Sequence, residues 1–469
     1  MLIVDAEIAG RPGLCLRTAG ARITEIAPGL RARADEHVID ARGGVIMPGL
    51  HDHHIHLYAA ARAAHSIECG PPSVRDEAQL TSALRRGAER ARPGESLRGI
   101  GYHESVAGEL DADRLDAWVG DRPLRIQHRT GALWVLNHAA LARIGAAPRD
   151  WPEGAERDAA GQPTGRFYRL DAWLRDELGA ALERPALRTL SRRLARYGVT
   201  GVTDTTPTLE DDDAAFLACA IEGDDLLQRC VVMGSEALGP IDHPRLTRGP
   251  VKILLDEPAL PDLDALVRRV RAAHDAGRGV AVHCVTRVEL ALAVTAIGEA
   301  GAIAGDRIEH ASVAPPEWVD LVAATPIAVV TQPHFVHERG DAYLEDVEPD
   351  DRLWLYRTRA WLEAGVPLAG GSDAPYGYPD PWRAMAAAVA RRTRAGRAVG
   401  AVEALTPQEA LALFTSDPLE PGAVQRKIDV GSAADLVLLD APWSTVRTSL
   451  DAKHVALTVS DGRVIHERD

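Results

Sequence analysis

The chain has 469 residues, with 53 Lys and Arg against 68 Asp and Glu, which gives a net charge of -15 at pH 7. Hydrophobic residues make up 46% and charged residues 26%, an ordinary mix for a globular chain of two or three domains, or for one large barrel with additions. No basic run stands apart from its acidic neighbours, so the composition argues against nucleic acid as a partner.

The five cysteines are widely spaced and form no CxxC pair, which fits a reducing compartment. The first residues lack the basic start of a signal peptide, so we expect a cytoplasmic protein. The most apolar stretch, 290–303, is interrupted by Glu299, and we therefore expect no membrane span.

The two ends of the chain have the pattern of short strands separated by turns. Residues 1–47 contain alternating segments such as LIVDAEIAG and ARITEIAPG, and residues 425–469 contain ADLVLLD and HVALTVSDGRVI. The residues of these segments alternate along the chain, and Gly and Pro separate the segments, which predicts small antiparallel sheets. Because chain termini often lie close together, we expect the two ends to form one composite β-sandwich domain.

Between these ends, at 48–424, short β-branched runs alternate with helical segments rich in Ala, Leu and Arg, for example 262–276 and 382–395. Eight runs have the composition of strands: 51–57, 199–205, 229–234, 251–256, 279–285, 307–311, 326–332 and 367–372. Such alternation predicts an α/β fold, a TIM-like (β/α)8 barrel. The alternative, an open doubly wound sheet, lacks a GxGxxG motif after its first strand.

A large insertion, at about 60–195, separates the first predicted barrel strand from the second and is far longer than a βα connection needs. An insertion after a barrel strand lies at the C-terminal face of the barrel, where active sites form. We therefore expect it to cap the site and to set substrate choice.

The strongest local motif is PGLHDHHIHL at 48–57. Residues two apart on a strand face the same side, so His54 and His56 are suited to bind one cation through two nitrogen atoms. Three further candidates fall at or near the ends of later predicted strands: His283, His310 and Asp373. Lys252 lies on a predicted strand between the first strand and these three. Strand ends of a barrel meet at one face, so this ordered set favours a metal centre.

These segments resemble the amidohydrolase superfamily of metal-dependent hydrolases over nearly the whole chain. The resemblance rests on PGLHDHHIH, VKILLD, VAVHC, RIEHA and GSDAP, with the terminal ADLVLLD and DGRVI. The long insertion, ALWVLN at 132–137 and SDAPYGYPDPW at 372–382 resemble the branch that contains N-substituted formamide deformylases.

The resemblance implies a role for each residue of the set. His54 and His56 would hold one metal ion with Asp373, while His283 and His310 would hold a second, and Zn²⁺ is compatible with such ligands. Lys252 would bridge the two ions as a carbamate. Asp373 would accept a proton from the attacking water and return it to the leaving amine.

Lysine is scarce in this chain, since only Lys252, Lys427 and Lys453 among the 53 basic residues are not Arg. Arg stays protonated and cannot be carboxylated, so a position that retains Lys is compatible with the carbamate. With Lys252 unmodified, a site for one ion remains open, in which His310 is an acid or base rather than a ligand.

Two segments depart from the pattern of the branch. LLDEPALPDLD, which begins at 254, contains no Gly, and RTGA at 129–132 stands where Asp-Gly-His is expected. Both would line the substrate pocket. Smaller candidates for substrate contacts are His103, Glu104, His128, Arg129, Trp134 and His334, although ordinary hydrogen bonds or packing explain each of them better.

The sequence therefore predicts a metal-dependent amidohydrolase that cleaves a C–N bond of a small molecule, in an amide, an N-formyl or N-acyl group or a cyclic amide. A mononuclear deaminase of a heterocyclic amine is the alternative within enzymes. A catalytically silent barrel with a role in binding or assembly is the alternative of another class, and the complete ligand set argues against it. The sequence does not decide the oligomeric state, and a homodimer is one possibility.

Overall fold

A computed structural model of the chain describes residues 1–71, 73–92, 94–145, 147–178 and 184–468. The chain divides into two compact units. The first combines Met1–Leu57 with Leu187–Asp469, and the second is Tyr58–Ala186. The second unit covers most of the segment predicted as an insertion, while the predicted domain boundaries and the capping role stay predictions.

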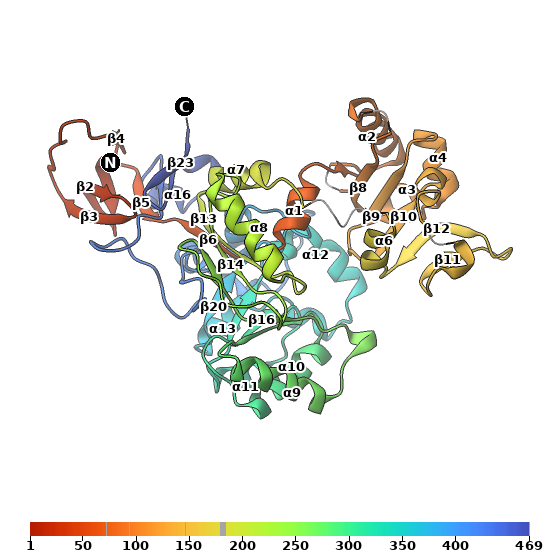
Figure 1. The fold of residues 1–469 in the computed structure, drawn as a ribbon. Helices are drawn as coiled ribbons and strands as arrows, with labels where there is room; N and C mark the ends of the chain where they lie inside the picture. Colours follow the sequence, from red (N-terminus) through yellow and green to blue (C-terminus); the bar gives the residue numbers. More distant parts are fainter. Residues whose placement is uncertain (72, 93, 146, 179–183, 469) are drawn as a thin grey trace. The chain divides into compact units, whose positions relative to one another are not determined.

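Two parallel sheets form the centre of the first unit (Figure 1). The four-stranded sheet has the order β15-β14-β13-β6, and its strands are β6 (Leu50–Ile55), β13 (Val199–Asp204), β14 (Arg229–Val232) and β15 (Leu246–Arg248). The five-stranded sheet has the order of its numbering: β16 (Val251–Ile253), β17 (Val280–Cys284), β18 (Arg307–His310), β19 (Ala328–Thr331) and β20 (Leu368–Gly370). Each of the eight runs predicted as barrel strands overlaps one of these strands, and the short β15 was not predicted.

Backbone hydrogen bonds join the two sheets at both edges. The amide of Asp373, beyond the end of β20, donates to the carbonyl of His54 in β6 over 2.7 Å, and the amide of Lys252 in β16 donates to the carbonyl of Gly234, beyond β14, over 3.0 Å. The strands described here do not pair into one closed sheet. The predicted α/β class is confirmed, whereas closure into a (β/α)8 barrel stays a proposal.

Helices follow the strands of both sheets. Those of the first unit are α7 (Arg188–Arg196), α8 (Asp211–Glu222), α9 (Leu263–Asp275), α10 (Arg287–Ala300), α11 (Pro316–Ala323), α12 (His334–Asp346), α13 (Thr358–Glu363), α14 (Pro381–Ala390), α15 (Pro407–Ala412) and α16 (Trp443–Val446). The helix predicted at 382–395 ends at Ala390, earlier than expected. Arg391 has a left-handed backbone, with φ of 47°, and its guanidinium donates to the carbonyls of Leu355 and Tyr356.

The two ends of the chain share one sheet. Its strands are β1 (Leu2–Ile8), β2 (Arg11–Ala19), β3 (Arg22–Ala27), β4 (Val38–Asp40), β5 (Val45–Pro48), β21 (Leu436–Leu439), β22 (Val455–Ser460) and β23 (Arg463–Glu467). β5 pairs antiparallel with β21, as the composite domain requires, and both ends supply the core around Ile3, Leu16 and Leu436.

Pairing links all eight strands of this terminal domain into one sheet, and their packing as a sandwich stays a prediction. The sheet is mixed rather than antiparallel, because β1 pairs in parallel with β4 and β5. The chain crosses over after β3, so β4 and β5 return alongside β1 in its own direction.

The second unit has a six-stranded sheet of order β11-β12-β10-β9-β8-β7. Its strands are β7 (Ile67–Glu68), β8 (Leu97–Tyr102), β9 (Leu124–His128), β10 (Leu133–Leu136), β11 (Ala155–Arg157) and β12 (Pro163–Tyr168). Its helices are α2 (Glu77–Arg90), α3 (Glu104–Ala107), α4 (Ala112–Val119), α5 (His138–Leu141) and α6 (Asp171–Glu177), and α1 (Leu57–Ala63) begins at its boundary. β8 and β9 are parallel neighbours, so their C-terminal ends lie together.

Among the residues that the structure describes, no helix combines the length and the apolar character that a membrane span requires.

Candidate metal centre

Three predicted ligands come together at the ends of β6 and β20. One nitrogen atom each of His54 and His56 and one carboxylate oxygen of Asp373 all lie within 4.8 Å of one another. The Nε2 atoms of His54 and His56 lie 3.4 and 3.3 Å from Oδ1 of Asp373. His54 and Asp373 are buried, and Nε2 of His54 has no hydrogen-bond partner within the described part of the chain. Such a buried group of two imidazoles and a carboxylate suits a divalent cation.

The backbone brings Asp373 to the two His residues. The amide of Ser372 donates to the buried carboxylate of Asp52 over 2.8 Å, which ties the end of β20 to β6. Gly371 lies so close to His54 that a Cβ there would be 2.6 Å from its backbone nitrogen, so this position needs Gly. Asp373 itself has a left-handed φ of 50°, a conformation that Asp adopts more readily than most residues.

In three of the predicted ligands the Nδ1 atom has a hydrogen-bond partner, which leaves the Nε2 atom available to bind a metal ion. Nδ1 of His54 contacts the carboxylate of Glu309, Nδ1 of His56 lies 3.2 Å from the hydroxyl of Thr206, and Nδ1 of His310 lies 2.7 Å from Oε1 of Gln332. A carboxylate only accepts hydrogen bonds, so Nδ1 of His54 carries a proton. Metal-ligating His residues have this arrangement, because the bond at one nitrogen fixes the tautomer that leaves the other free to bind.

Glu309 is a functional residue that the sequence analysis missed. Its carboxylate is fully buried between Nδ1 of His54 and the guanidinium of Arg307, which also donates to the carbonyl of His53 over 2.6 Å. A sequence signal existed, since the RIEHA segment places two charged side chains on a predicted barrel strand, and every residue of that strand is buried. Buried charges need partners, and here the partners are each other and a candidate metal ligand.

The remaining predicted ligands lie on strands of the five-stranded sheet: Lys252, His283 and His310. The centroid of the His310 ring is 4.7 Å from that of His54 and 4.5 Å from that of His283. Lys252 is on β16, whose pairing with β17 places it opposite Ala281, near His283. Its Nζ atom is buried and makes no hydrogen bond in the part of the chain described. His310 also has a left-handed φ, of 70°.

Burial and neighbouring charges set the protonation of these groups. Burial lowers the pKa of His283 to about 3 and holds that of His310 well below the usual range, so both rings are neutral and able to bind metal. Burial also lowers the pKa of Lys252, although the charge of Glu309 opposes this.

For the two acidic groups of the centre, neighbouring residues lower the pKa although burial alone would raise it. Burial opposes ionisation of Asp373, but the neighbouring rings of His54 and His56 outweigh it and hold the pKa well below its usual range. Glu309 is likewise held ionised against burial, chiefly by Arg307. Burial lowers the pKa of His54, yet the charge of Glu309 and the hydrogen bonds to Asp373 and Glu309 together outweigh burial and raise the pKa overall, so a cation must compete with a proton at this ring.

The smaller candidates lie in other settings, and their contact with substrate stays a prediction. His334 is buried, and its Nε2 donates to the carbonyl of Ser372 over 3.0 Å. Trp134 is packed in the second unit, and the guanidinium groups of Arg98 and Arg125 lie 5.2 and 5.3 Å from its ring centroid.

The other four, also in the second unit, are adjacent to one another at the ends of β8 and β9. Nε2 of His128 lies 3.1 Å from the carboxylate of Glu104, the ring centroids of His103 and His128 are 5.9 Å apart, and the amide of Arg129 donates to the carbonyl of Tyr102 over 2.8 Å.

The chain matches known proteins over most of its length. A family model described as "Amidohydrolase family" matches residues 37–466. The chain is 28% identical to an N-substituted formamide deformylase from Arthrobacter pascens, over 93% of this chain and 91% of that protein.

Solved structures share the fold at lower identity. An uncharacterized metal-dependent hydrolase from Pyrococcus horikoshii aligns with a TM-score of 0.74 and 18% identity, over 97% of this chain and 99% of that one. A mutant of atrazine chlorohydrolase from Arthrobacter aurescens, in complex with zinc and atraton, aligns with a TM-score of 0.55 and 15% identity, over 99% and 95% of the two chains.

Proposed function

The chain belongs to the amidohydrolase family and is a hydrolase, and from this premise we propose that it cleaves a C–N bond of a small molecule with a metal-activated water. The substrate class we propose is an amide, an N-formyl or N-acyl amine or a cyclic amide. The N-substituted formamide deformylase to which the chain is similar supports an N-formyl amine as the first compound to test.

The observation that carries the proposal is the group of His54, His56 and Asp373. Two imidazole nitrogen atoms approach one carboxylate oxygen at 3.4 and 3.3 Å, and the buried Nε2 of His54 lacks a hydrogen-bond partner within the described residues. Leaving such an atom without a partner is costly, and a cation would remove that cost. The donor set suits Zn²⁺, and the neighbour that was solved with zinc supports this choice.

When bound, a divalent cation would lower the pKa of a coordinated water and polarise the scissile carbonyl. Asp373 would take the proton from the attacking water, because its pKa is low enough to keep it ionised and its Oδ1 lies beside both imidazoles. The same carboxyl group would then deliver the proton to the leaving amine. Glu309 would hold the His54 ring in the binding tautomer.

We propose further that His283 and His310 hold a second ion and that Lys252, as a carbamate, joins the two. Two properties of Lys252 support the carbamate. Its Nζ is buried without a hydrogen-bond partner in the described part of the chain, and burial lowers its pKa toward the neutral amine that CO₂ requires. The two parallel sheets would then be the halves of one (β/α)8 barrel, with these ligands at its C-terminal face.

One observation favours the mononuclear alternative. The three-residue group forms without His283 or His310, and among the described His, Cys, Asp and Glu residues it is the single group of three or more whose ligand atoms all lie within 4.8 Å of one another. A deaminase that uses one ion would need no more. Metal content separates the two proposals, since the binuclear hydrolase needs a second ion for each chain.

The experiment is a metal-loaded substrate screen. The protein is loaded with Zn²⁺, its zinc content is measured, and N-formyl amines, N-acyl amines, lactams and aminated heterocycles are assayed for released amine, ammonia or acid. Release of amine from the first three classes supports the proposal, and release of ammonia from heterocycles supports the alternative. A protein that binds no metal and releases no product would contradict both. His54→Asn should lose zinc and turnover. The matched control is His37→Asn, at an exposed histidine of the same unit, which should lose neither.

A further inference from the structure

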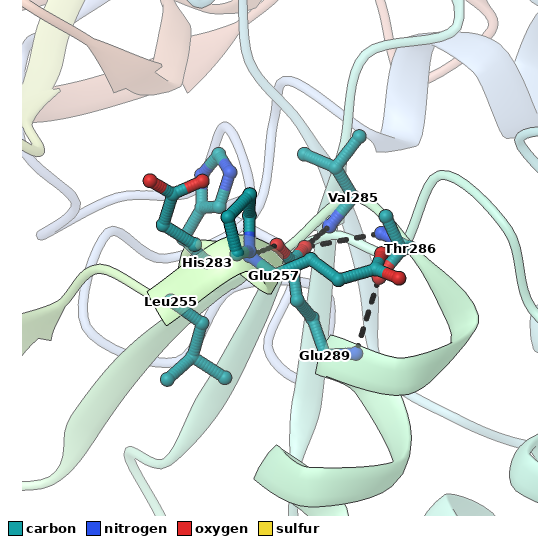
Figure 2. Close-up of a pocket in the computed structure, with 8 residues that line it drawn as sticks. Leu255, Glu257, His283, Val285, Thr286 and Glu289 are labelled. Carbon is teal, nitrogen blue, oxygen red and sulfur yellow. Dashed lines mark hydrogen bonds between the residues drawn. The ribbon is translucent and has the colours of Figure 1, made fainter. Parts of the chain in front are cut away.

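A cavity of about 680 Å³ opens beside His283, between the loop that follows β16 and the loop that follows β17 (Figure 2). Three apolar side chains form part of its wall, Leu255, Pro258 and Val285. His283 is a proposed metal ligand, so this cavity adjoins the reacting centre. The two loops therefore decide the shape of the space that a substrate would enter.

One buried side chain connects the two loops. Glu289, in the first turn of α10, is 4% exposed, and its carboxylate accepts three backbone hydrogen bonds. Oε2 accepts from the amides of Val285 and Thr286, at 2.7 and 3.1 Å, and Oε1 accepts from the amide of Glu257 at 3.0 Å. Figure 2 shows these bonds converging on Glu289 at the edge of the cavity. A buried carboxylate needs such bonds, and bonds to a charged acceptor are among the stronger ones in proteins.

Only part of this arrangement is ordinary helix capping. Thr286 and Glu289 form a capping box, in which the hydroxyl of Thr286 also accepts from the amide of Glu289 at 3.2 Å. The bond from Glu257 has no place in a capping box, because Glu257 belongs to the loop after β16. The register of β16 with β17 ends at Ile253 and Val282, so Glu289 joins the two loops beyond the last paired residues.

We propose that Glu289 is a positioning residue, which fixes the cavity wall beside His283 by binding the Glu257 amide as well as capping α10. The inference rests on the proposed function, because it takes this cavity as the place where part of the substrate binds. Glu289 touches no reacting atom. Its effect is on the position of Leu255, Pro258 and Val285, and therefore on substrate affinity more than on the chemical step.

The variant Glu289→Asp separates the two roles of the side chain. This chain already uses Asp in a capping box, since Asp213 occupies the same position in the first turn of α8. Asp should therefore retain the cap of α10, while its shorter side chain cannot reach Glu257. The matched control is Glu409→Asp, which shortens the equivalent residue in the capping box of α15.

Hydrogen exchange measured by mass spectrometry tests directly the hydrogen bond from the Glu257 amide to Glu289. In Glu289→Asp, exchange in the segment 254–259 should be about fivefold faster than in the wild type, while exchange in 284–287 stays near the wild-type rate, since a lost bond of about 1 kcal/mol changes the opening equilibrium by about fivefold. Zinc content should match the wild type. Unchanged exchange in 254–259 would overturn the proposal, as would loss of zinc.

Kinetics with the best amide from the screen test the role toward substrate. Glu289→Asp should raise KM about tenfold and leave kcat within about twofold, because a change in binding that is equal in ground and transition states acts on KM alone. Glu409→Asp should change neither. Equal losses in kcat for the two variants would indicate a general loss of stability and contradict positioning. Exchange does not depend on turnover, so failure of the proposed function would be seen as an inactive wild type with the exchange result intact.

Discussion

Two clusters of this molecule each combine two His residues with one carboxylate at strand ends, yet their ring nitrogen atoms are used in opposite ways. In the metal centre, Nδ1 of His54 donates to Glu309, so the unprotonated Nε2 atom is left to bind a cation beside Asp373. In the second unit, Nδ1 of His128 accepts from the backbone amide of Thr130 over 3.3 Å. The proton of that neutral ring is therefore on Nε2, which donates to Glu104.

His103 follows the same rule as His128, since its Nδ1 accepts from the amide of Ser105 over 3.2 Å. The cluster of the second unit thus satisfies its own hydrogen bonds, and it is also more open, with 45% of the Glu104 side chain exposed. Residue types and strand ends are alike in the two clusters. The atoms that face Nδ1 decide which of them is suited to a metal ion.

The largest effect is expected from removing a ligand. His54→Asn should reduce zinc affinity by more than about a hundredfold, beyond the loss usual for an outer partner of a ligand, and turnover should fall with it. His128→Asn should leave zinc content unchanged. Zinc measured after dialysis tests both variants, and equal losses in the two would abolish the distinction between the clusters.

Lys252→Arg should remove most of the turnover and the second ion, because Arg cannot form a carbamate. Lys427→Arg, at an exposed position of the same unit, is the matched control. Metal analysis and the mass of the intact protein in the presence of ¹³C-labelled bicarbonate provide the measurement. Wild-type metal content and activity in Lys252→Arg would refute the carbamate.

A smaller effect is expected from the partner of His54. Glu309→Gln retains every proposed ligand but weakens control of the His54 tautomer, and zinc affinity should fall by about 10- to 100-fold. Glu104→Gln makes the same change in the second cluster and should leave zinc affinity as it is. Competition with a chelator measures both, and a Glu309→Gln protein with wild-type affinity would show that the tautomer does not need Glu309.

The smallest effect is on stability. Glu104→Gln should lower the free energy of unfolding by less than about 1 kcal/mol, because Glu104 is partly exposed. Burial opposes the charge of Glu104, but its hydrogen bonds outweigh burial and its pKa is lowered. Its contribution is therefore present above the ordinary pKa of Glu and is lost as the pH falls through the lowered value. Urea unfolding at neutral and at acidic pH should show the variant converging on the wild type in acid, and a difference that grows in acid would contradict this sign.

Local patterns were sufficient to predict eight of the nine strands of the two parallel sheets, because short β-branched runs between helices have few other structures open to them. The HDHHIH segment predicted one pair of ligands for the same reason, since alternate residues of a strand share a face. The end of α14 at Ala390 was not predictable in this way, because Arg391 is fixed by carbonyl groups of distant residues.

The residue types of the centre and their order along the strands were determined by the sequence alone. Tertiary structure decided that Asp373 meets His54 and His56, that Glu309 fixes the His54 ring, and that Glu289 joins the loops after β16 and β17. It also decided that His128, which has a carboxylate just as near, uses its nitrogen atoms in the opposite sense. The physical reason is that a tautomer and a hydrogen bond depend on which atoms face a side chain across several ångströms, and these atoms come from strands far apart in the sequence.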